Sequence, residues 1–514
     1  MKRGFFVFSL LIVFSICLFA SDEDDDLGCV VGDRKYFGRD YIVKNPRATL
    51  PEPIGIPLDK MGRCAPISVY STQEECEVWT EDQRIGCWIY RPFAPRVAVV
   101  GDTIYIVWCQ RFYSKFTHRE VCYVRSTDGG VSWSDSILLS VTDGVESVTP
   151  DIAVEHNNVY LVWEDWCSTS QDCGLYFRKS TDGGENWLPI QPLALAGPDD
   201  YDYYRPSMVV KDSSVFVAFA KNVDLDGMLK FKKSSDCGEN WSEEIHISDR
   251  AVCGHWAKMV LNSAGLYVTY QNGVSIWCNR STDWGDTWSD DMFISDMENS
   301  TAQWPSTGAD DNGGVYITWF DYKYSPYPWT GDIFLRRSTD NGQTWRSIQV
   351  LTDNHLCIES DVCADKPSAH VVWHDERHNM GDGNVEIYHR RSTNLGATWL
   401  EETRLTDAPY QSDDPRIIKD NAKLHMVWVD NRHEPDAQAV YFKKGAWYYP
   451  GDPNGDRIVN SSDVVYLINF LFKAGPGPNV FEAGDSNGDG VINSADVVYL
   501  INYLFKEGPA PAGC

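Results

Sequence analysis

The sequence predicts a mainly β fold, a propeller of six or seven blades with seven favoured, followed by a small α-helical module that binds calcium. Three observations lead to this expectation. A short motif ending in Trp occurs six times, strand-like segments surround each copy, and two calcium-type loops lie near the end of the chain. Self-similarity at an interval of about fifty residues is typical of propellers and other repeat folds.

The chain begins with the features of a secretory signal peptide. Lys2 and Arg3 give a positive start, residues 5–19 form an apolar run, and Ala20 is a small residue at the expected cleavage point. The run is shorter than a membrane span, so residues 1–20 are predicted to be removed from a secreted chain. An uncleaved membrane anchor is the alternative.

The composition restricts the partners of the chain. The formal net charge is −29 at pH 7, which argues against nucleic acid and against an anionic membrane, because both require a basic surface. No membrane insertion is expected after signal cleavage. The charge is compatible with a secreted protein that binds calcium or neutral glycans.

Cysteines predict disulfide bonds. Fourteen of the 15 remain once the signal peptide is removed, an even number in an exported chain. Zinc is the alternative, although no paired CxxC spacing supports it. The pairs close in sequence are Cys109 with Cys122, Cys167 with Cys173, and Cys357 with Cys363. Further cysteines crowd the N-terminal segment 21–94, namely Cys29, Cys64, Cys76 and Cys87.

The repeated motif has the form S-x-[DN]-x-G-x-[TSN]-W. Its starts are 54, 54, 47, 57 and 54 residues apart, a regularity that chance does not produce. The copies are STDGGVSW (126–133), STDGGENW (180–187), SSDCGENW (234–241), STDWGDTW (281–288), STDNGQTW (338–345) and STNLGATW (392–399).

Each motif lies within a unit of four expected strands. Val, Ile, Tyr and Trp alternate with polar residues at period two, which indicates half-buried strands. Four short strands in about fifty residues are typical of a propeller blade. Examples of the four strands, in order, are PRVAVV (95–100), VYLVWED (159–165), GLYFRKS (174–180) and SILLS (136–140).

A seventh unit is present in part. Three strands are expected at 414–420, 423–430 and 439–444, without a motif or a fourth strand after them. An open ring would expose a strand edge, so the N-terminal segment 21–94 is expected to supply the missing strand. This favours seven blades, with the propeller covering residues 95–446.

The six motifs resemble the Asp-box, or bacterial neuraminidase (BNR), repeats of sialidase-like propellers, and the resemblance extends over roughly residues 90–445. In that family the Asp accepts backbone N–H bonds in a hairpin turn, the Gly takes a conformation that other residues resist, and the Trp packs under the turn. Asp128, Gly130 and Trp133 have the residue types that such a turn needs. Asn394 replaces Asp in the sixth copy. The resemblance therefore implies an architectural role for these motifs.

The C-terminal residues 451–514 contain a second repeat. Two similar segments begin at Gly451 and Gly484, and each places oxygen ligands at positions 1, 3, 5, 7, 9 and 12 of a loop. Two Ca²⁺ ions are therefore predicted. The expected ligands are Asp452, Asn454, Asp456, the carbonyl of Ile458, Asn460 and Asp463 in the first loop, and Asp485, Asn487, Asp489, the carbonyl of Val491, Asn493 and Asp496 in the second.

One expected helix follows each loop, so the module resembles a type I dockerin. The resemblance implies binding to a cohesin domain of a scaffold or surface protein, which would place the secreted chain at a cell surface. Arg457 stands at position 6 of the first loop, where EF-hands have Gly, and this implies a strained turn or a weaker site. A calcium-stabilised cap without a cohesin partner is the alternative. The short stretch 445–451 predicts that the module lies close to the propeller.

The loops opposite the motif turns surround the expected central pocket. Aromatic rings, carboxylates and arginines in these loops suit sugars. The carboxylates proposed as catalytic acids are Asp165, Asp321, Asp375 and Asp430. The proposed substrate-binding residues are Tyr204, Arg205, Trp329 and Arg377. The recurring pairs Asp375-x-Arg377 and Asp430-x-Arg432 are equally interpreted as structural braces.

Exo-sialidases of this fold use an arginine triad, a Tyr nucleophile with a Glu partner, and an Asp acid, and they carry Arg-Ile-Pro in the first blade. This sequence has no such motif there, the nearest string being Tyr90-Arg91-Pro92. Arg205, Arg377 and Arg416 would make a triad, but nothing in the sequence requires it. The sequence is therefore interpreted as a secreted carbohydrate-active protein, a glycoside-hydrolysing propeller tethered through a dockerin. The alternatives are a non-catalytic propeller that binds glycan or protein, and an exo-sialidase.

Overall fold

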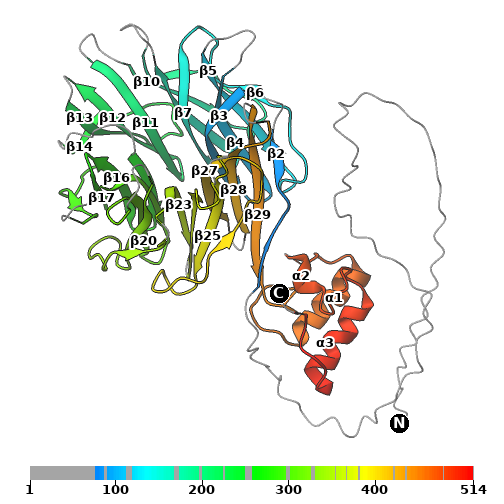
Figure 1. The fold of residues 1–514 in the computed structure, drawn as a ribbon. Coiled ribbons are helices and arrows are strands. Elements are labelled where there is room, and N and C mark those ends of the chain that lie inside the picture. Colours follow the sequence, from blue (N-terminus) through cyan, green and yellow to red (C-terminus); the bar gives the residue numbers. More distant parts are fainter. Residues whose placement is uncertain are drawn as a thin grey trace, which may run out of the picture. The chain divides into compact units, whose positions relative to one another are not determined.

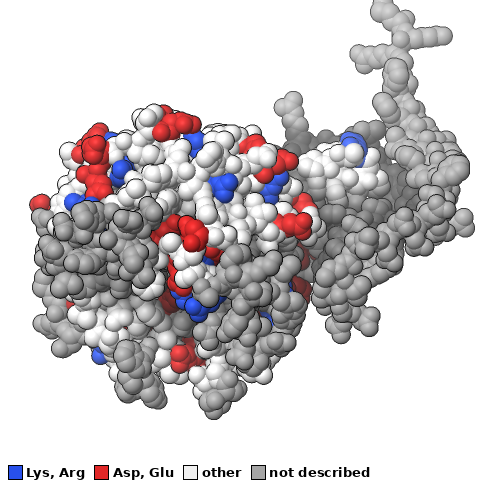
Figure 2. Space-filling model, turned by 90° about the horizontal axis from the view of Figure 1, so that it is seen from above, with Lys and Arg blue, Asp and Glu red and all other residues white. Residues whose placement is uncertain are grey.

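A computed structural model describes residues 76–85, 90–111, 118–166, 173–195, 200–223, 226–248, 257–296, 301–325, 330–353, 355–365, 367–379, 383–420, 423–434, 437–478 and 480–512. The predicted signal peptide and most of the N-terminal segment lie outside this part. Within it, no helix is long and apolar enough to cross a membrane. Acidic side chains form patches on the face drawn in Figure 2, with basic side chains between them.

The strands form seven antiparallel sheets, which confirms a seven-bladed propeller (Figure 1). The first three sheets, each given from its first strand in sequence, are β3 (Tyr90–Val100), β4 (Thr103–Arg111), β5 (Arg119–Ser126) and β6 (Ile137–Leu138); β7 (Glu146–Glu155), β8 (Asn158–Trp166), β9 (Gly174–Ser180) and β10 (Gln191–Leu195); and β11 (Asp200–Lys211), β12 (Ser214–Val223), β13 (Asp226–Ser234) and β14 (Ile245–Ser248).

The next three sheets repeat this order. They are β15 (Ala257–Asn262), β16 (Gly265–Asn272), β17 (Ser275–Ser281) and β18 (Met292–Phe293); β19 (Gln303–Ala309), β20 (Val315–Asp321), β21 (Asp332–Ser338) and β22 (Gln349–Val350); and β23 (Cys357–Asp365), β24 (Ser368–Asp375), β25 (Glu386–Ser392) and β26 (Thr403–Arg404). The first strand of each blade contacts the first strand of the next, from β3 through β23, so these strands line the axis.

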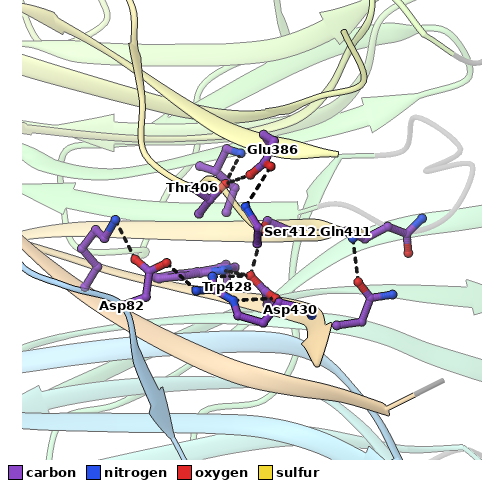
Figure 3. A network of polar contacts seen from close by, with 12 residues as sticks. Asp82, Glu386, Thr406, Gln411, Ser412, Trp428 and Asp430 are labelled. Carbon is purple, nitrogen blue, oxygen red and sulfur yellow. Dashed lines mark hydrogen bonds and ion pairs between the residues drawn. The ribbon is translucent and has the colours of Figure 1, made fainter. Parts of the chain in front are cut away.

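The N-terminal segment completes the seventh blade. This sheet contains β27 (Ser412–Asp420), β28 (Lys423–Glu434) and β29 (Ala437–Tyr448), and its outer strands β1 (Cys76–Trp79) and β2 (Gln83–Ile85) both pair with β29. Between them Asp82 forms ion pairs with Arg432 at 2.7 Å and with Lys443 at 2.6 Å (Figure 3). β27 in turn contacts β3, so residues from both ends of the propeller sequence close the ring.

The six motifs form the turn between the third and fourth strands of their blades. In the first copy Asp128 Oδ1 accepts hydrogen bonds from the backbone N–H groups of Val131 and Ser132, and Ser126 Oγ accepts one from Gly130. Gly130 has a φ of 82°, and a Cβ there would lie 2.8 Å from the ring of Phe442 in the seventh blade. The conserved form of the motif thus follows from turn geometry and close packing between blades.

A basic residue directly before each of the first five motifs links its blade to the next one. In the first blade Arg125 donates to the carbonyl of Gly183, the fourth motif residue of the second blade, at 2.7 Å. The same bond recurs around the ring, and Lys444 of the seventh blade donates to Gly129 of the first. The other donor–acceptor pairs are Lys179 to Cys237, Lys233 to Trp284, Arg280 to Asn341 and Arg337 to Leu395. We call these six bonds the blade latches.

The motif aspartates are expected to make the propeller sensitive to acid. Hydrogen bonds from Thr344 lower the pKa of Asp340 from 3.8 to about 2, although partial burial opposes the shift. A carboxylate with a lowered folded pKa stabilises the fold above its unfolded pKa, and this stabilisation is lost as the pH falls from about 4 to 2. We expect Asp340→Asn to fold normally and to show a smaller fall in melting temperature between pH 5 and pH 2.

The sixth motif supplies the precedent for this variant, because Asn394 Oδ1 already accepts the backbone N–H of Thr398 at 2.9 Å. Asp135→Asn is the matched control, since Asp135 is exposed and lies outside the motif. A melting profile of Asp340→Asn that follows the wild-type profile at every pH would contradict the expectation.

Two of the predicted disulfide pairs are wrong. Cys109, Cys122, Cys357 and Cys363 are free and buried. Cys109 pairs with Val121 across the β4–β5 ladder, so Cys122 is displaced by one residue and its side chain points to the opposite face. Cys357 and Cys363 are both in β23, six residues apart, a separation of about 20 Å along a strand. Cys173 is in a disulfide, as is Cys76, while Cys167 lies outside the described residues.

The C-terminal module contains α1 (Ser461–Lys473), the short α2 (Phe481–Gly484) and α3 (Ser494–Lys506). The two long helices begin at equivalent caps, Asn460 and Asn493, each with a reciprocal bond to the Asp three residues later. Their apolar faces meet in a core of their own, formed by Val459, Val464, Leu467, Ile492, Val497, Leu500 and Leu504. The module therefore has the buried core that separate folding requires.

Candidate functional site: a charged pocket on the propeller axis

The first strand of most blades begins with the same irregularity. A non-glycine residue with positive φ precedes the inward-facing residue by two positions, and the pairing register shifts at this point. The residues with positive φ are Ala94, Thr149, Arg205, Trp304, Glu359 and Asp414, with φ between 37° and 51°. The residues two positions later are Arg96, Asp151, Ser207, Ser306, Asp361 and Arg416. Backbone of this kind costs about 1–2 kcal/mol per residue, and such strain is frequent at functional sites.

Most of these residues line a pocket of about 250 Å³ on the axis, at the end opposite the motif turns, while Trp304, Ser306 and Asp361 line a smaller hollow beside it. The wall of the pocket combines cations and carboxylates from six blades with a few small and apolar residues. The charged and titratable members are Arg96, Asp151, Arg205, Lys258, Glu359, His374, Asp413, Asp414 and Arg416. A channel of about 360 Å³ continues between the first strands, where most of its lining is apolar.

Two carboxyl groups of the pocket have opposite protonation states near neutral pH. Burial raises the pKa of Asp413 to about 8, reinforced by the neighbouring Asp414 and Glu359. Burial also acts on Glu359, but Arg416 and His374 outweigh it and lower the pKa of Glu359 to about 2. At pH 7 Asp413 is a neutral acid and Glu359 a carboxylate. Two carboxyl groups whose pKa values differ in this way commonly act, one as an acid and the other as a base or nucleophile.

The Arg416 side chain holds two carboxyl groups in place, those of Glu359 and Asp414, and burial raises the pKa of Asp414 to about 7. Arg416 lies 2.6 Å from Glu359 Oε1 and 2.5 Å from Asp414 Oδ1. Asp414 Oδ2 also accepts the backbone N–H of Ala94 at 2.7 Å, which connects the seventh blade to the first. The arrangement of charged groups in the pocket is therefore fixed in part by a contact that crosses the closure of the ring.

Of the predicted substrate-binding residues, Arg205 lines the pocket. Burial lowers the pKa of Arg205 to about 10, which indicates a guanidinium group largely withdrawn from water. Arg377 does not line it, because its guanidinium group pairs with Asp375 at 2.6 Å and with Glu402. Trp329 and the side chain of Tyr204 lie outside the described part of the structure. Arg416 joins Arg205 in the pocket, whereas the triad with Arg377 does not form.

The four predicted catalytic aspartates lie at the ends of second strands and are not among the residues that line this pocket. Asp375 and Asp430 each accept the indole N–H of a Trp two residues earlier, at 3.3 and 3.0 Å. Asp430 also accepts from Ser412 Oγ and pairs with Arg432 at 2.6 Å (Figure 3). These contacts are the braces that the Asp-x-Arg spacing predicts.

Asp321 and Asp165 have comparable roles. Asp321 accepts hydrogen bonds from the N–H and hydroxyl groups of Thr301 and from the N–H of Lys323. Asp165 accepts from Trp163 Nε1 and Ser147 Oγ, and burial raises its pKa to about 6. All four carboxylates thus position the loops around the pocket, and a catalytic role for them stays a prediction.

Sequence reasoning missed Glu359 and assigned no role to Asp413. The available signal was the recurring Pro followed by an inward residue, seen in Pro95-Arg96, Pro150-Asp151 and Pro415-Arg416. Reading the residues just before this Pro in each blade would have pointed to Asp413 and Asp414. Glu359 lacks the signal because Ser360 replaces the proline.

The first carboxylate of each C-terminal loop is held by backbone N–H groups of the same loop. In the first loop Asp452 accepts the N–H groups of Gly455, Asp456 and Arg457, so its oxygens face the loop interior. Asp463 Oδ1 is buried without a hydrogen-bond partner, and burial together with Asp452 and Asp456 raises the pKa of Asp463 to about 7. A buried carboxylate oxygen without a donor, close to other carboxyl groups, is the kind of ligand that Ca²⁺ prefers.

The second loop repeats this arrangement, with Asp485 accepting from Asp489 and Gly490. The sixth position takes a left-handed conformation in both loops, with a φ of 80° at Gly490 and 68° at Arg457. The predicted strain at Arg457 is therefore present, since a residue with a Cβ occupies a conformation that glycine adopts freely.

Comparisons with known proteins identify the C-terminal module. Residues 450–505 match the type I dockerin domain. No curated protein matches the chain. Solved structures with similarity include a Hadza microbial sialidase (15% identity, TM-score 0.41, covering 55% of this chain and 63% of that one) and a Trypanosoma rangeli sialidase with the inhibitor DANA (12%, 0.43, 69% and 55%). A protein of unknown function from Dyadobacter fermentans is also similar (14%, 0.43, 59% and 95%). The chain thus spans less than two thirds of both sialidases, and the propeller assignment rests on the seven sheets themselves.

Proposed function

We propose that the propeller is a glycoside hydrolase whose reaction takes place in the axial pocket. The observation that supports this most directly is the neutral Asp413 beside the ionised Glu359, because hydrolysis of a glycosidic bond needs one carboxylic acid and one carboxylate. Asp413 protonates the leaving oxygen, Glu359 acts as base or nucleophile, and Arg205 binds hydroxyl groups of the sugar.

We further propose that the dockerin binds two Ca²⁺ ions through the loop ligands named above and joins a cohesin domain outside the cell. A dockerin implies a cohesin partner, and cohesin binding would place the propeller beside other polysaccharide-degrading modules. A non-catalytic glycan-binding propeller is the second candidate, because the arginines and carboxyl groups of the pocket can also hold a sugar without cleaving it.

Asp413→Asn tests the hydrolase. The full chain is incubated with a panel of polysaccharides and glycosides that includes sialosides, and products are identified by mass spectrometry. We expect Asp413→Asn to slow release by about 10²–10⁴-fold, because the amide cannot donate an acidic proton. The wild-type rate should fall as the pH rises above about 8, where Asp413 loses its proton.

Asp375→Asn is the comparison variant, since the sequence singled out Asp375 while the structure places it in a brace. Melting temperatures separate unfolding from lost chemistry. If Asp375→Asn abolishes release and Asp413→Asn does not, the proposed acid is wrong. Retention of a glycan without any release supports the binding module, and release of sialic acid would identify an exo-sialidase.

A further inference from the structure

The second strand of every blade carries a buried ring at one equivalent position. This position lies three residues before the Trp of β4, β8, β20, β24 and β28, and before the corresponding aromatic residue of β12 and β16. The residues found there are Tyr105, Tyr160, Phe216, Tyr267, Tyr316, His370 and His425, none of them more than 2% exposed. The first five blades therefore have Tyr or Phe, whereas the sixth and seventh have histidine, the side chain that gains a proton near neutral pH.

These rings pack at the junction with the following blade, near the motif turns. In the fifth blade Tyr316 lies against the turn of the sixth motif. His370 stacks on Trp447 of the seventh blade, with the ring centroids 4.8 Å apart. His425 stacks on Phe442 at 6.0 Å, and Phe442 lies against the turn of the first motif. The two histidines thus occupy the two junctions of the seventh blade, which closes the ring.

His370 belongs to a chain of hydrogen bonds that reaches the N-terminal strand β1. His389 Nδ1 lies 3.0 Å from Glu77 Oε1, and His370 Nδ1 lies 3.1 Å from His389 Nε2. The partners assign the tautomers, because His389 donates to the carboxylate through Nδ1 and its Nε2 accepts the Nδ1–H of His370. His370 Nε2 is buried without a hydrogen-bond partner within the described structure. A proton added to either ring would therefore leave one N–H group without an acceptor.

Positive charges surround both histidines. The charged groups that face His370 and its partner from the packed strands are Arg391 of β25, Lys419 of β27, Asp365 of β23 and Glu77 of β1. Those near His425 are Lys423 of β28, Lys444 of β29, Asp420 of β27, and the exposed Asp102 and Asp128 of the first blade. Burial, reinforced by His389 and the two cations, holds the pKa of His370 well below 6.5. Burial, reinforced by Lys444 and Lys423, lowers the pKa of His425 to about 3.

Acid acts in one direction at this end of the blade. A histidine whose folded pKa lies below its unfolded value of about 6.5 stabilises the fold above that value, and the stabilisation is lost as the pH falls below it. Burial raises the pKa of Glu77, but His389 and Trp79 outweigh it and lower the value to about 2, so Glu77 titrates later. At the pocket end, burial raises the pKa of Asp413 to about 8 and that of Asp414 to about 7, so acid stabilises that end instead.

We propose that the motif-turn end of the seventh blade is a clasp that acid releases through His370 and His425. Release of the clasp frees the N-terminal strand β1 and the end of β29, which lies directly before the C-terminal module in the sequence. The inference goes beyond the proposed function and does not depend on it, because neither histidine is among the residues that line the axial pocket.

Free cysteines in the described part of the chain can report the opening of single junctions. Cys363 is opposite His370 in the β23–β24 ladder, Cys122 lies in the core between the seventh and first blades, and Cys278 lies between the fourth and fifth. The full chain is labelled with a pyridyl disulfide, which also reacts with thiols in acid, and the modified peptides are quantified by mass spectrometry. Dividing each rate by that of Cys278 removes the common effect of pH on thiol reactivity.

Between pH 7 and pH 5 we expect the wild-type rates at Cys363 and Cys122 to rise by roughly 25-fold relative to Cys278. This is the change that one histidine produces when it titrates only after opening. His370→Tyr should abolish the rise at Cys363, and His425→Phe should abolish the rise at Cys122. Both variants install a ring that other blades carry at this position.

His246→Phe is the matched control, because His246 is exposed on β14, and its rates should follow those of wild type. A wild-type ratio that stays constant between pH 7 and pH 5 would overturn the clasp. A rise that persists in His370→Tyr and His425→Phe would overturn it as well. The wild-type ratio decides the inference even where a variant does not fold.

Discussion

Chelation of calcium is expected to unfold the C-terminal module while the propeller keeps its fold. The first loop brings Asp452, Asp456 and Asp463 together, and the buried Asp463 Oδ1 has no donor. Without a cation these carboxylates repel one another, so metal binding and folding of the module are coupled. Hydrogen exchange read by mass spectrometry should show α1 and α3 exchanging at the rate of an unfolded chain, with β20 still protected.

Readdition of Ca²⁺ should restore protection, whereas readdition of Mg²⁺ should not, because Mg²⁺ demands a smaller and stricter octahedral site. Binding of the chain to a cohesin domain should likewise return with Ca²⁺ but not with Mg²⁺. If α1 and α3 remain as protected in chelator as in calcium, the coupling is wrong. Loss of protection in β20 would show instead that the propeller depends on a metal.

Removing the Asp82 side chain is expected to be the most destabilising single change at the closure of the ring. Asp82 lies 2.7 Å from Arg432 and 2.6 Å from Lys443, and these three side chains are between 10% and 17% exposed. Asp82→Ala leaves the two cations without this carboxylate and loosens β1 and β2 on β29. Removing one partner of a buried ion pair costs about 3–5 kcal/mol. Because Arg432 keeps its ion pair with Asp430, we expect the free energy of unfolding to fall by about 3 kcal/mol.

Asp102→Ala is the control for this variant, because the pair of Asp102 with Lys423 has the same charges but is 74% and 42% exposed at a distance of 3.5 Å. An exposed pair contributes about 0–1 kcal/mol. Urea unfolding of both variants, followed by tryptophan fluorescence, measures the difference. Similar losses in the two variants would show that burial of the Asp82 cluster does not stabilise the closure.

Much of the fold could be predicted because its signals are local. The motif turn depends on residues within eight positions, such as Asp128 and Ser132, and the helix caps at Asn460 and Asn493 depend on residues three positions apart. The partial seventh unit also indicated where a strand was missing. Disulfide pairs predicted from closeness in sequence were less reliable, because Cys357 and Cys363 lie on one strand and are therefore far apart.

The pocket could not be predicted in the same way because distant segments build it. Ala94 and Asp414 are 320 residues apart, yet they are joined by a 2.7 Å hydrogen bond at the pocket wall. The protonation of Asp413 depends on burial and on Glu359, neither of which is visible in the sequence. Conversely, the sequence did not show that the acids at the ends of the second strands have partners. In three of the four, the carboxylate accepts the indole N–H of the Trp two residues earlier on the same strand face, as Asp430 does from Trp428.

The blade latches join six of the seven blade junctions, and the contact of β23 with β27 completes a circular array without terminal repeats. In a linear solenoid an end repeat can fray alone, because only one neighbour supports it. Here each of the six motif turns receives a donor from the blade before it, and Lys444 passes this dependence from the last blade back to the first. Opening any of the first five blades therefore breaks two latches, whereas the sixth and seventh blades each take part in one. A protease outside the cell would therefore find loops to cleave, but no frayed end blade.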